Sequence, residues 1–285
     1  MIAEQEGRFD QAAKVLQQSL RELTADGITQ STRYTSIAHE YARALTKAGD
    51  FNRAWQAEQE VLAIATKTGR DDSSGFHAMV NVGSTALIGG GQPRRAVELI
   101  DKTLAKARTS APQGATPFYL DGTRLVALVD AGSAQALDGE LNRLAGVAEE
   151  QGLPSLATLY RTVAVQSALN RRDIATATAQ WSLLAAQEGA LRANAATWRE
   201  AEQVLIEHAR LALAGGHSAD ALQFLNQATA LAPDKDRAKG REAMQIALLR
   251  TSAAFTDHDY DAAARAADAA LQLARLQAVD SQSSA

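Results

Sequence analysis

Cysteine is absent from this sequence of 285 residues, and its absence removes several classes of site at once. Without a thiol there is no disulfide, no thiolate nucleophile and no cysteine-ligated zinc. The absence suits the cytoplasm and the periplasm equally, so cysteine usage does not identify the redox compartment.

Two further absences concern membranes and nucleic acids. No run of about 18 apolar residues occurs, the length that a membrane-spanning helix needs. The N-terminal "MIAEQEGRFDQ" lacks the basic and apolar regions of a signal peptide. The net charge of −4 provides no broad basic surface for nucleic acid. We therefore expect a soluble protein, cytoplasmic or periplasmic, that neither inserts into a membrane nor binds nucleic acid.

The side chains that are present favour helices. Apolar residues make up 46% of the chain, yet aromatic residues make up only 5%, and alanine is abundant. Alanine is the best helix former, and β-branched runs that alternate with polar residues are hard to find. The composition predicts an all-α fold.

A repeat of about 42 residues runs along the chain. It is visible in "GRFDQAAKVLQQSL" from Gly7, "GDFNRAWQAEQEVL" from Gly49, "GGGQPRRAVELIDKTL" from Gly89 and "HDYDAAARAADAAL" from His258. One alanine marks each unit: Ala12, Ala54, Ala96, Ala136, Ala177, Ala221 and Ala263. The turn residue five positions earlier is Gly7, Gly49, Gly91, Ala131, Arg172, Gly216 or His258.

A second helical pattern precedes six of these turns, so each unit is predicted to be two antiparallel helices. Stacked units of this period form a solenoid, in which each buries its apolar face on its neighbours. We expect a single solenoid over residues 1–280 and a polar tail at 281–285. Its parts are a half repeat at 1–25 and units at about 32–68, 74–109, 116–151, 154–189, 198–232 and 238–277. The half repeat leads us to expect that the natural protein continues upstream.

The spacing of small residue, turn residue, aromatic and alanine resembles the tetratricopeptide repeat, in its longer variant of about 42 residues. The resemblance is strongest at 34–65 and 76–107 and weakest around 110–150, where "SAPQGATPF" lengthens a connection. It implies a right-handed superhelical solenoid whose first helices line a concave surface. The three glycines at 89–91 are then a turn between helices, not a phosphate loop, because no Lys-Ser or Lys-Thr follows them.

No catalytic site, metal site or cofactor site is predicted. The five histidines lie in different repeats and form no His-x-x-x-His pair. "FTDHDYD" at 255–261 is interpreted as a turn before an acidic helix start, in preference to a divalent-cation site. "GRDDSSG" at 69–75 is interpreted as a loop with a helix cap, since it lacks the calcium-loop spacing. Trp55, Trp181 and Trp198 are assigned to the core.

The concave surface is the predicted binding site. Residues 18, 15 and 11 positions before each marker alanine share a helix face. The polar members in the second to sixth units are the candidate groove residues: Ser36, His39, Arg43, Asn81, Thr85, Asp121, Thr162, Gln166, Gln203 and Arg210. Arg43 and Arg210 can hold a carboxylate, and Asn81 can bond a peptide backbone. Asn81 also matches a position where the long-variant repeats often contact bound peptide.

These observations predict a non-enzymatic scaffold that binds a protein or an extended peptide. The repeats look like those that follow the kinase domain in bacterial Ser/Thr protein kinases, which implies a sensory or docking region of a larger signalling protein. Two alternatives stay open. One is the ligand-sensing region of a multidomain transcriptional activator, and the other is an oligomerisation module in which the chain associates with itself.

Overall fold

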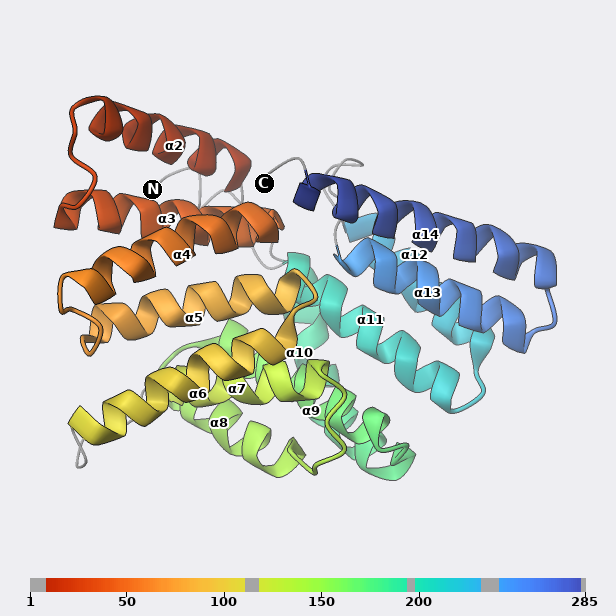
Figure 1. Ribbon diagram of the computed structural model, residues 1–285. Helices are drawn as coiled ribbons and strands as arrows, with labels where there is room; N and C mark the ends of the chain where they lie inside the picture. The colour runs from red at the N-terminus through yellow and green to blue at the C-terminus, as the bar shows by residue number, and fades with distance from the viewer. Residues whose placement is uncertain (1–8, 111–117, 194–197, 232–240, 283–285) are drawn as a thin grey trace. The chain divides into compact units, whose positions relative to one another are not determined.

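The computed structural model describes residues 9–110, 118–193, 198–231 and 241–282, and every regular element within these ranges is an α-helix (Figure 1). Thirteen helices, α2 to α14, follow one another along the described chain. The predicted all-α class of sequential helix pairs is confirmed. The chain divides into two compact units, residues 1–131 and 132–285, which are described separately below.

The first unit contains the last helix of a half repeat, two complete hairpins and one more first helix. Its helices are α2 (Phe9–Ala25), α3 (Thr32–Ala48), α4 (Phe51–Lys67), α5 (Ser74–Gly89), α6 (Pro93–Ser110) and α7 (Phe118–Asp130). Each helix packs on the next, and α5 also packs on α3 and on α7. The first helices of successive hairpins therefore lie side by side.

The second unit repeats this arrangement. Its helices are α8 (Asp138–Glu150), α9 (Pro154–Asn170), α10 (Ile174–Ala193), α11 (Trp198–Ala214), α12 (Ser218–Leu231), α13 (Arg241–Thr256) and α14 (Tyr260–Gln282). Consecutive helices pack on each other, and α11 also packs on α9 and on α13. Here the first helices α9, α11 and α13 lie side by side.

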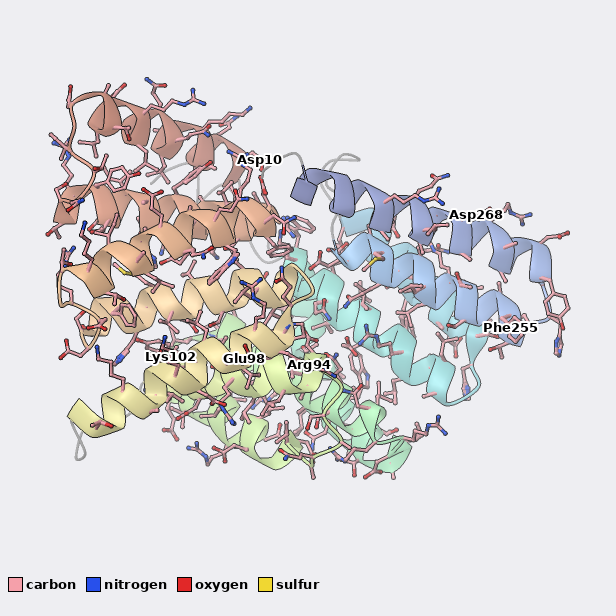
Figure 2. All side chains as sticks on the ribbon, viewed as in Figure 1. Asp10, Arg94, Glu98, Lys102, Phe255 and Asp268 are labelled. Carbon is pink, nitrogen blue, oxygen red and sulfur yellow. The ribbon has the colours of Figure 1, made fainter. Side chains whose placement is uncertain are left out.

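The marker alanines lie where helices meet. Six of them are the fourth residue of a helix and are buried: Ala12, Ala54, Ala96, Ala177, Ala221 and Ala263. A methyl group at a helix contact allows a short interaxial distance, which a larger side chain would prevent. The opposite face of such a helix is polar, as on α6, where Arg94, Glu98 and Lys102 follow one another at four-residue spacing (Figure 2).

Ala136 is the exception, and the predicted register is wrong there. It is exposed and precedes α8, whose fourth residue, Leu141, is fully buried and takes the position of the marker. The left-handed residue after α7 is Gly132, with φ 79°, one position later than the expected Ala131. The turn at 131–137 is longer than the other hairpin turns, so a constant spacing fails across it. The boundary between the two units falls at its start.

The three glycines at 89–91 have separate structural roles. Gly91 adopts φ 73° and its N–H donates to the Ile88 carbonyl, which ends α5. The N–H of Gly90 donates to the Ala86 carbonyl, so the loop amides are used by the helix itself. A Cβ on Gly89 would overlap the Phe51 ring, so this glycine permits the close packing of α4 on α5. These contacts support the interpretation of this segment as a turn.

Candidate functional site

Five of the predicted groove residues lie on neighbouring first helices of the first unit. Ser36, His39 and Arg43 share one face of α3, and Asn81 and Thr85 share one face of α5. Ser36, Arg43 and Thr85 are exposed, whereas His39 and Asn81 are partly buried. Because α3 packs on α5 and α5 on α7, we call this surface the first-helix face.

A buried histidine–carboxylate pair, His39 and Glu58, lies at the α3 part of this face. His39 Nδ1 lies 2.9 Å from Glu58 Oε1, and Glu58 reaches it from α4. The Glu58 side chain is fully buried, while 16% of the His39 side chain is exposed. Glu58 Oε2 is also buried and has no hydrogen-bond partner in the described part of the chain.

Burial and mutual attraction change the protonation of this pair. Burial raises the pKa of Glu58 to about 7, against the opposing effect of the hydrogen bond from His39. Burial alone lowers the pKa of His39, but the hydrogen bond and charge of Glu58 outweigh it, so the net shift is upward. The pair therefore gains or loses a proton close to neutral pH.

Sequence reasoning missed Glu58, although the repeat contains the signal. Glu58 is four residues after its marker alanine. In four other units the same position is occupied by a large apolar residue that is buried, namely Leu16, Ile100, Trp181 or Leu225. An acid at a position that is apolar elsewhere in the repeat is a candidate functional residue.

Gly83 of α5 lets the neighbouring helix approach this pair. A Cβ at Gly83 would lie 3.2 Å from Trp55 Cζ3 and 3.3 Å from Glu58 Cγ. Trp55 is therefore packed between α4 and α5, as the assignment of this residue to the core expects. The close approach closes off Glu58 from the side of α5.

Asn81 is oriented by α7. Its Oδ1 accepts a hydrogen bond from the Thr123 hydroxyl at 2.6 Å. The Thr85 hydroxyl donates to the Asn81 backbone carbonyl at 2.8 Å. No hydrogen bond joins the side-chain N–H groups of Asn81 to another described residue. Thr123 was not among the predicted residues, and its role depends on the packing of α5 against α7.

Arg43 stands one helical turn beyond His39. Its guanidinium Nη2 lies 2.6 Å from Glu40 Oε2, and both side chains are more than two-fifths exposed. An exposed pair of this kind is weak. A ligand carboxylate can therefore compete with Glu40 for the guanidinium.

Asp121 lies elsewhere. It lines an open cavity of 360 Å³ between α6 and α7 together with Asp101, Leu104 and Arg124. Arg124 Nε lies 2.5 Å from Asp101 Oδ1 across this cavity. The register of α7 is displaced by one residue, as the position of Gly132 indicates, so Asp121 does not align with Asn81.

The second unit brings together only part of its predicted residues. Gln166 on α9 is partly buried, and Thr162 on the same helix is 1% exposed, with its hydroxyl donating to the Thr158 carbonyl. The expectation that Thr162 contributes to an accessible groove is therefore wrong. The burial arises because α9 packs against α8, α10 and α11 and has no wide polar face.

Gln203 and Arg210 converge on a buried acid of their own helix. Gln203 Nε2 donates to Glu207 Oε1 at 3.1 Å, and Arg210 Nη1 lies 3.0 Å from the same oxygen. Glu207 is fully buried. The three residues are spaced so that they share one face of α11, and both predicted groove residues are oriented by Glu207.

Two more titratable residues of the second unit belong to its interior. Burial raises the pKa of Glu202 to about 8, and repulsion by Glu242 adds to the shift. His208 lies between the rings of Trp181 and Phe224, at centroid distances of 3.9 Å and 3.6 Å. Burial lowers the pKa of His208 to about 4, so this imidazole is neutral at neutral pH and acts as a stacked aromatic ring. Trp181 and Trp198 are buried, as expected of core residues.

The described residues form neither a metal site nor a membrane span. Within the described ranges, no three His, Asp or Glu side chains gather in a way that would hold a metal ion. None of the described helices combines the length and the hydropathy that crossing a bilayer requires.

Comparison with known proteins identifies no family for this chain. No protein-family model matches it, and no curated protein matches it. Among solved structures, it is similar to nearly identical TPR-like repeats of a putative kinesin light chain from Podosopora anserina. The two share 17% identity over 82% of this chain and 92% of that chain, with a TM-score of 0.44.

Proposed function

We propose that this protein is a non-enzymatic scaffold that binds an extended peptide on the first-helix face of its first unit. One observation carries the proposal. Asn81 is held through its Oδ1 by Thr123, and its amide N–H groups are left as donors in the middle of the face. An oriented asparagine can donate to the carbonyl groups of a peptide backbone without regard to sequence.

The flanking residues supply the contacts that would select a sequence. Ser36 and Arg43 lie on α3 to one side of Asn81, and Thr85 extends the face along α5. The guanidinium of Arg43 favours a ligand carboxylate. His39 offers Nε2 to the face, because its Nδ1 is bonded to Glu58.

The second unit provides a matching face on α9, α11 and α13. Gln166, Gln203 and Arg210 are its polar members, and Thr162 is excluded by its burial. We propose that this face, taken by itself, is a second surface of the same chemistry.

The finer assignment concerns the whole protein. We propose a sensory or docking region of a larger bacterial signalling protein with a kinase-like catalytic domain, on the resemblance of the repeats alone. A His-Arg-Asp catalytic loop encoded upstream of residue 1 would support it, and a helix-turn-helix would support a transcriptional activator instead.

Peptide selection on the purified chain tests the binding function. Ligands would be selected from a random peptide library displayed on phage, and their affinities measured by fluorescence anisotropy. The combined variant Arg43→Ala, Asn81→Ala should bind them at least about tenfold more weakly, which corresponds to about 1.4 kcal/mol.

The control variant carries Glu98→Ala and Lys102→Ala on the outer face of α6, and its affinities should match the wild type. An equal loss of peptide affinity in both variants would reject the first-helix face as the binding site. Unchanged affinity in the Arg43→Ala, Asn81→Ala variant would reject it as well. Circular dichroism establishes that both variants are folded.

A further inference from the structure

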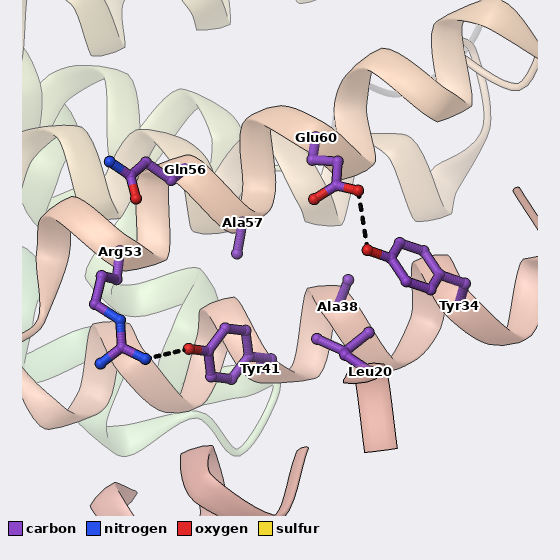
Figure 3. A pocket seen from close by; sticks show the side chains of 8 residues that line it. All are labelled: Leu20, Tyr34, Ala38, Tyr41, Arg53, Gln56, Ala57 and Glu60. Carbon is purple, nitrogen blue, oxygen red and sulfur yellow. Dashed lines mark hydrogen bonds between the residues drawn. The ribbon is translucent and has the colours of Figure 1, made fainter. Parts of the chain in front are cut away.

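An open cavity of 210 Å³ lies on the opposite face of α3 from Ser36, His39 and Arg43. At 100° per residue, the cavity-lining positions on α3 are turned about 165° away from those three residues. The lining comes from α2 (Leu20), α3 (Tyr34, Ala38 and Tyr41) and α4 (Arg53, Gln56, Ala57 and Glu60), as Figure 3 shows. We call it the Ala38–Ala57 slot.

Two hydrogen bonds close the ends of the slot. The Tyr34 hydroxyl donates to Glu60 Oε1 at 2.9 Å, and Arg53 Nη2 donates to the Tyr41 hydroxyl at 2.5 Å. Both bonds join α3 to α4, and the methyl groups of Ala38 and Ala57 face the space between them (Figure 3). The slot therefore has an apolar centre and two polar ends.

Comparison with the next repeat shows why this space exists. Forty-two residues further along, Val80 and Leu99 occupy the positions of Ala38 and Ala57. Val80 is fully buried, and Leu99 packs against the same core cluster. In the second hairpin two branched side chains occupy this space. In the first hairpin the two alanines are too small to fill it, so the cavity stays open.

The charge at the two ends is unequal. Arg53 is paired with Asp50, with 3.1 Å between Nη1 and Oδ2. Glu60 accepts a hydrogen bond from Tyr34 and forms no ion pair with any residue in the described ranges. The Glu60 carboxylate is therefore the negative end of the slot, and Arg53, which donates to the Tyr41 hydroxyl, is the positive end. Aromatic rings beside a carboxylate favour a cation.

We propose that the Ala38–Ala57 slot binds a lysine or arginine side chain of a protein partner. The aliphatic stem lies over Ala38 and Ala57 between the two tyrosines, and the cationic head reaches Glu60. A long basic side chain fits this arrangement, because it combines an apolar stem with a charged end. The site is independent of the first-helix face and would recruit a partner from the other side of α3.

Titration of the full chain with acetyl-Gly-Arg-Gly-amide, followed by NMR of backbone amides, tests the proposal. Shifts should concentrate at residues 34–41 and 53–60, with a Kd on the order of 1 mM, as expected for a single side chain. Acetyl-Gly-Glu-Gly-amide should produce no such shifts. Peptide binding confined to residues 36–43 and 81–85 would instead locate the peptide on the first-helix face and overturn the slot.

Two substitutions separate shape from charge. Ala57→Leu fills the slot as Leu99 does in the next repeat, and should weaken binding at least about tenfold. Glu60→Gln should weaken it about fivefold and remove its dependence on salt. Glu98→Gln, an exposed acid on α6, should leave the affinity unchanged.

Ala38→Val provides a second filled variant if Ala57→Leu unfolds the chain. Undiminished binding in a folded filled variant, equal affinity for the glutamate peptide, or no shifts at about 20 mM arginine peptide would each overturn the proposal.

Discussion

At the scale of single residues, the burial of the Glu58 carboxyl group reduces the stability of the first unit. A carboxyl group transferred from water to a protein interior loses solvation that one hydrogen bond does not fully replace. His39 supplies that bond from the edge of the binding face, while Oε2 has no partner in the described ranges. Leucine occupies this position in other repeats, as Leu16 and Leu225, and would avoid this cost. We therefore attribute a role in orienting His39 to Glu58.

The pKa shifts of this pair predict how stability depends on pH. The pKa of Glu58 is about 7 in the folded chain against an ordinary value of 4.5, so the folded state binds more protons between these values. The free energy of unfolding should therefore fall as pH rises from about 5 to about 7. The raised pKa of His39 acts in the same direction, because its stabilisation is lost as pH rises.

Glu58→Gln imitates the neutral acid and should reduce this fall by on the order of 1–3 kcal/mol. The comparison is made by urea unfolding, followed by circular dichroism, at several pH values in this window. Glu202 in the second unit also makes the free energy of unfolding fall as pH rises. Both proteins contain Glu202, so its contribution cancels when the variant is compared with the wild type. Parallel curves for the variant and the wild type would show that Glu58 has an ordinary pKa.

At the scale of elements, the turns decide where each helix ends. Gly49 has φ 85° and its N–H donates to the carbonyl groups of Leu45 and Thr46, which closes α3. Arg172 and His258 take the same place in later hairpins with φ 60°, although both have a Cβ. A left-handed conformation costs a non-glycine residue about 1 kcal/mol.

The two kinds of turn should respond to substitution with opposite signs. Gly49→Ala is expected to destabilise the chain by about 1 kcal/mol, and Arg172→Gly to stabilise it by up to about 0.5 kcal/mol after the entropy cost of glycine. Gly139→Ala in α8 is the control. A Cβ there meets no atom within 4 Å, so the substitution should be neutral or stabilising. Thermal unfolding measures all three, and a destabilised Arg172→Gly variant would contradict the argument.

At the scale of the whole molecule, the chain divides at residue 131 into two compact units. The periodic pattern predicts one array over 1–280, whereas the structure groups residues 1–131 and 132–285 into separate compact units. In repeat proteins stability comes from contacts between neighbouring repeats, so we expect each compact group of repeats to unfold as a unit.

Limited proteolysis tests this division. Cleavage should occur first in the turn at 131–137, and the fragment 1–131 should remain helical and unfold cooperatively when isolated. Its melting would be followed by circular dichroism beside that of the full chain. A fragment that is unfolded on its own would show that the two units depend on each other.

The sequence by itself determined the helices and their pairing. Turn residues, helix-forming alanines and the spacing of about 42 residues act locally, and local chemistry repeats in every unit. The same regularity explains why the predicted register is wrong before α8. The turn there is longer than the others, and a constant period cannot predict a longer turn. Leu141, not Ala136, therefore occupies the marker position.

Only the tertiary structure decided which side chains meet. His39 with Glu58, Asn81 with Thr123, and the slot between Ala38 and Ala57 all join different helices. The burial of Thr162 likewise depends on the helices that surround α9. A repeat pattern predicts which face of a helix is polar, but the side chain that meets that face is set by packing between different helices.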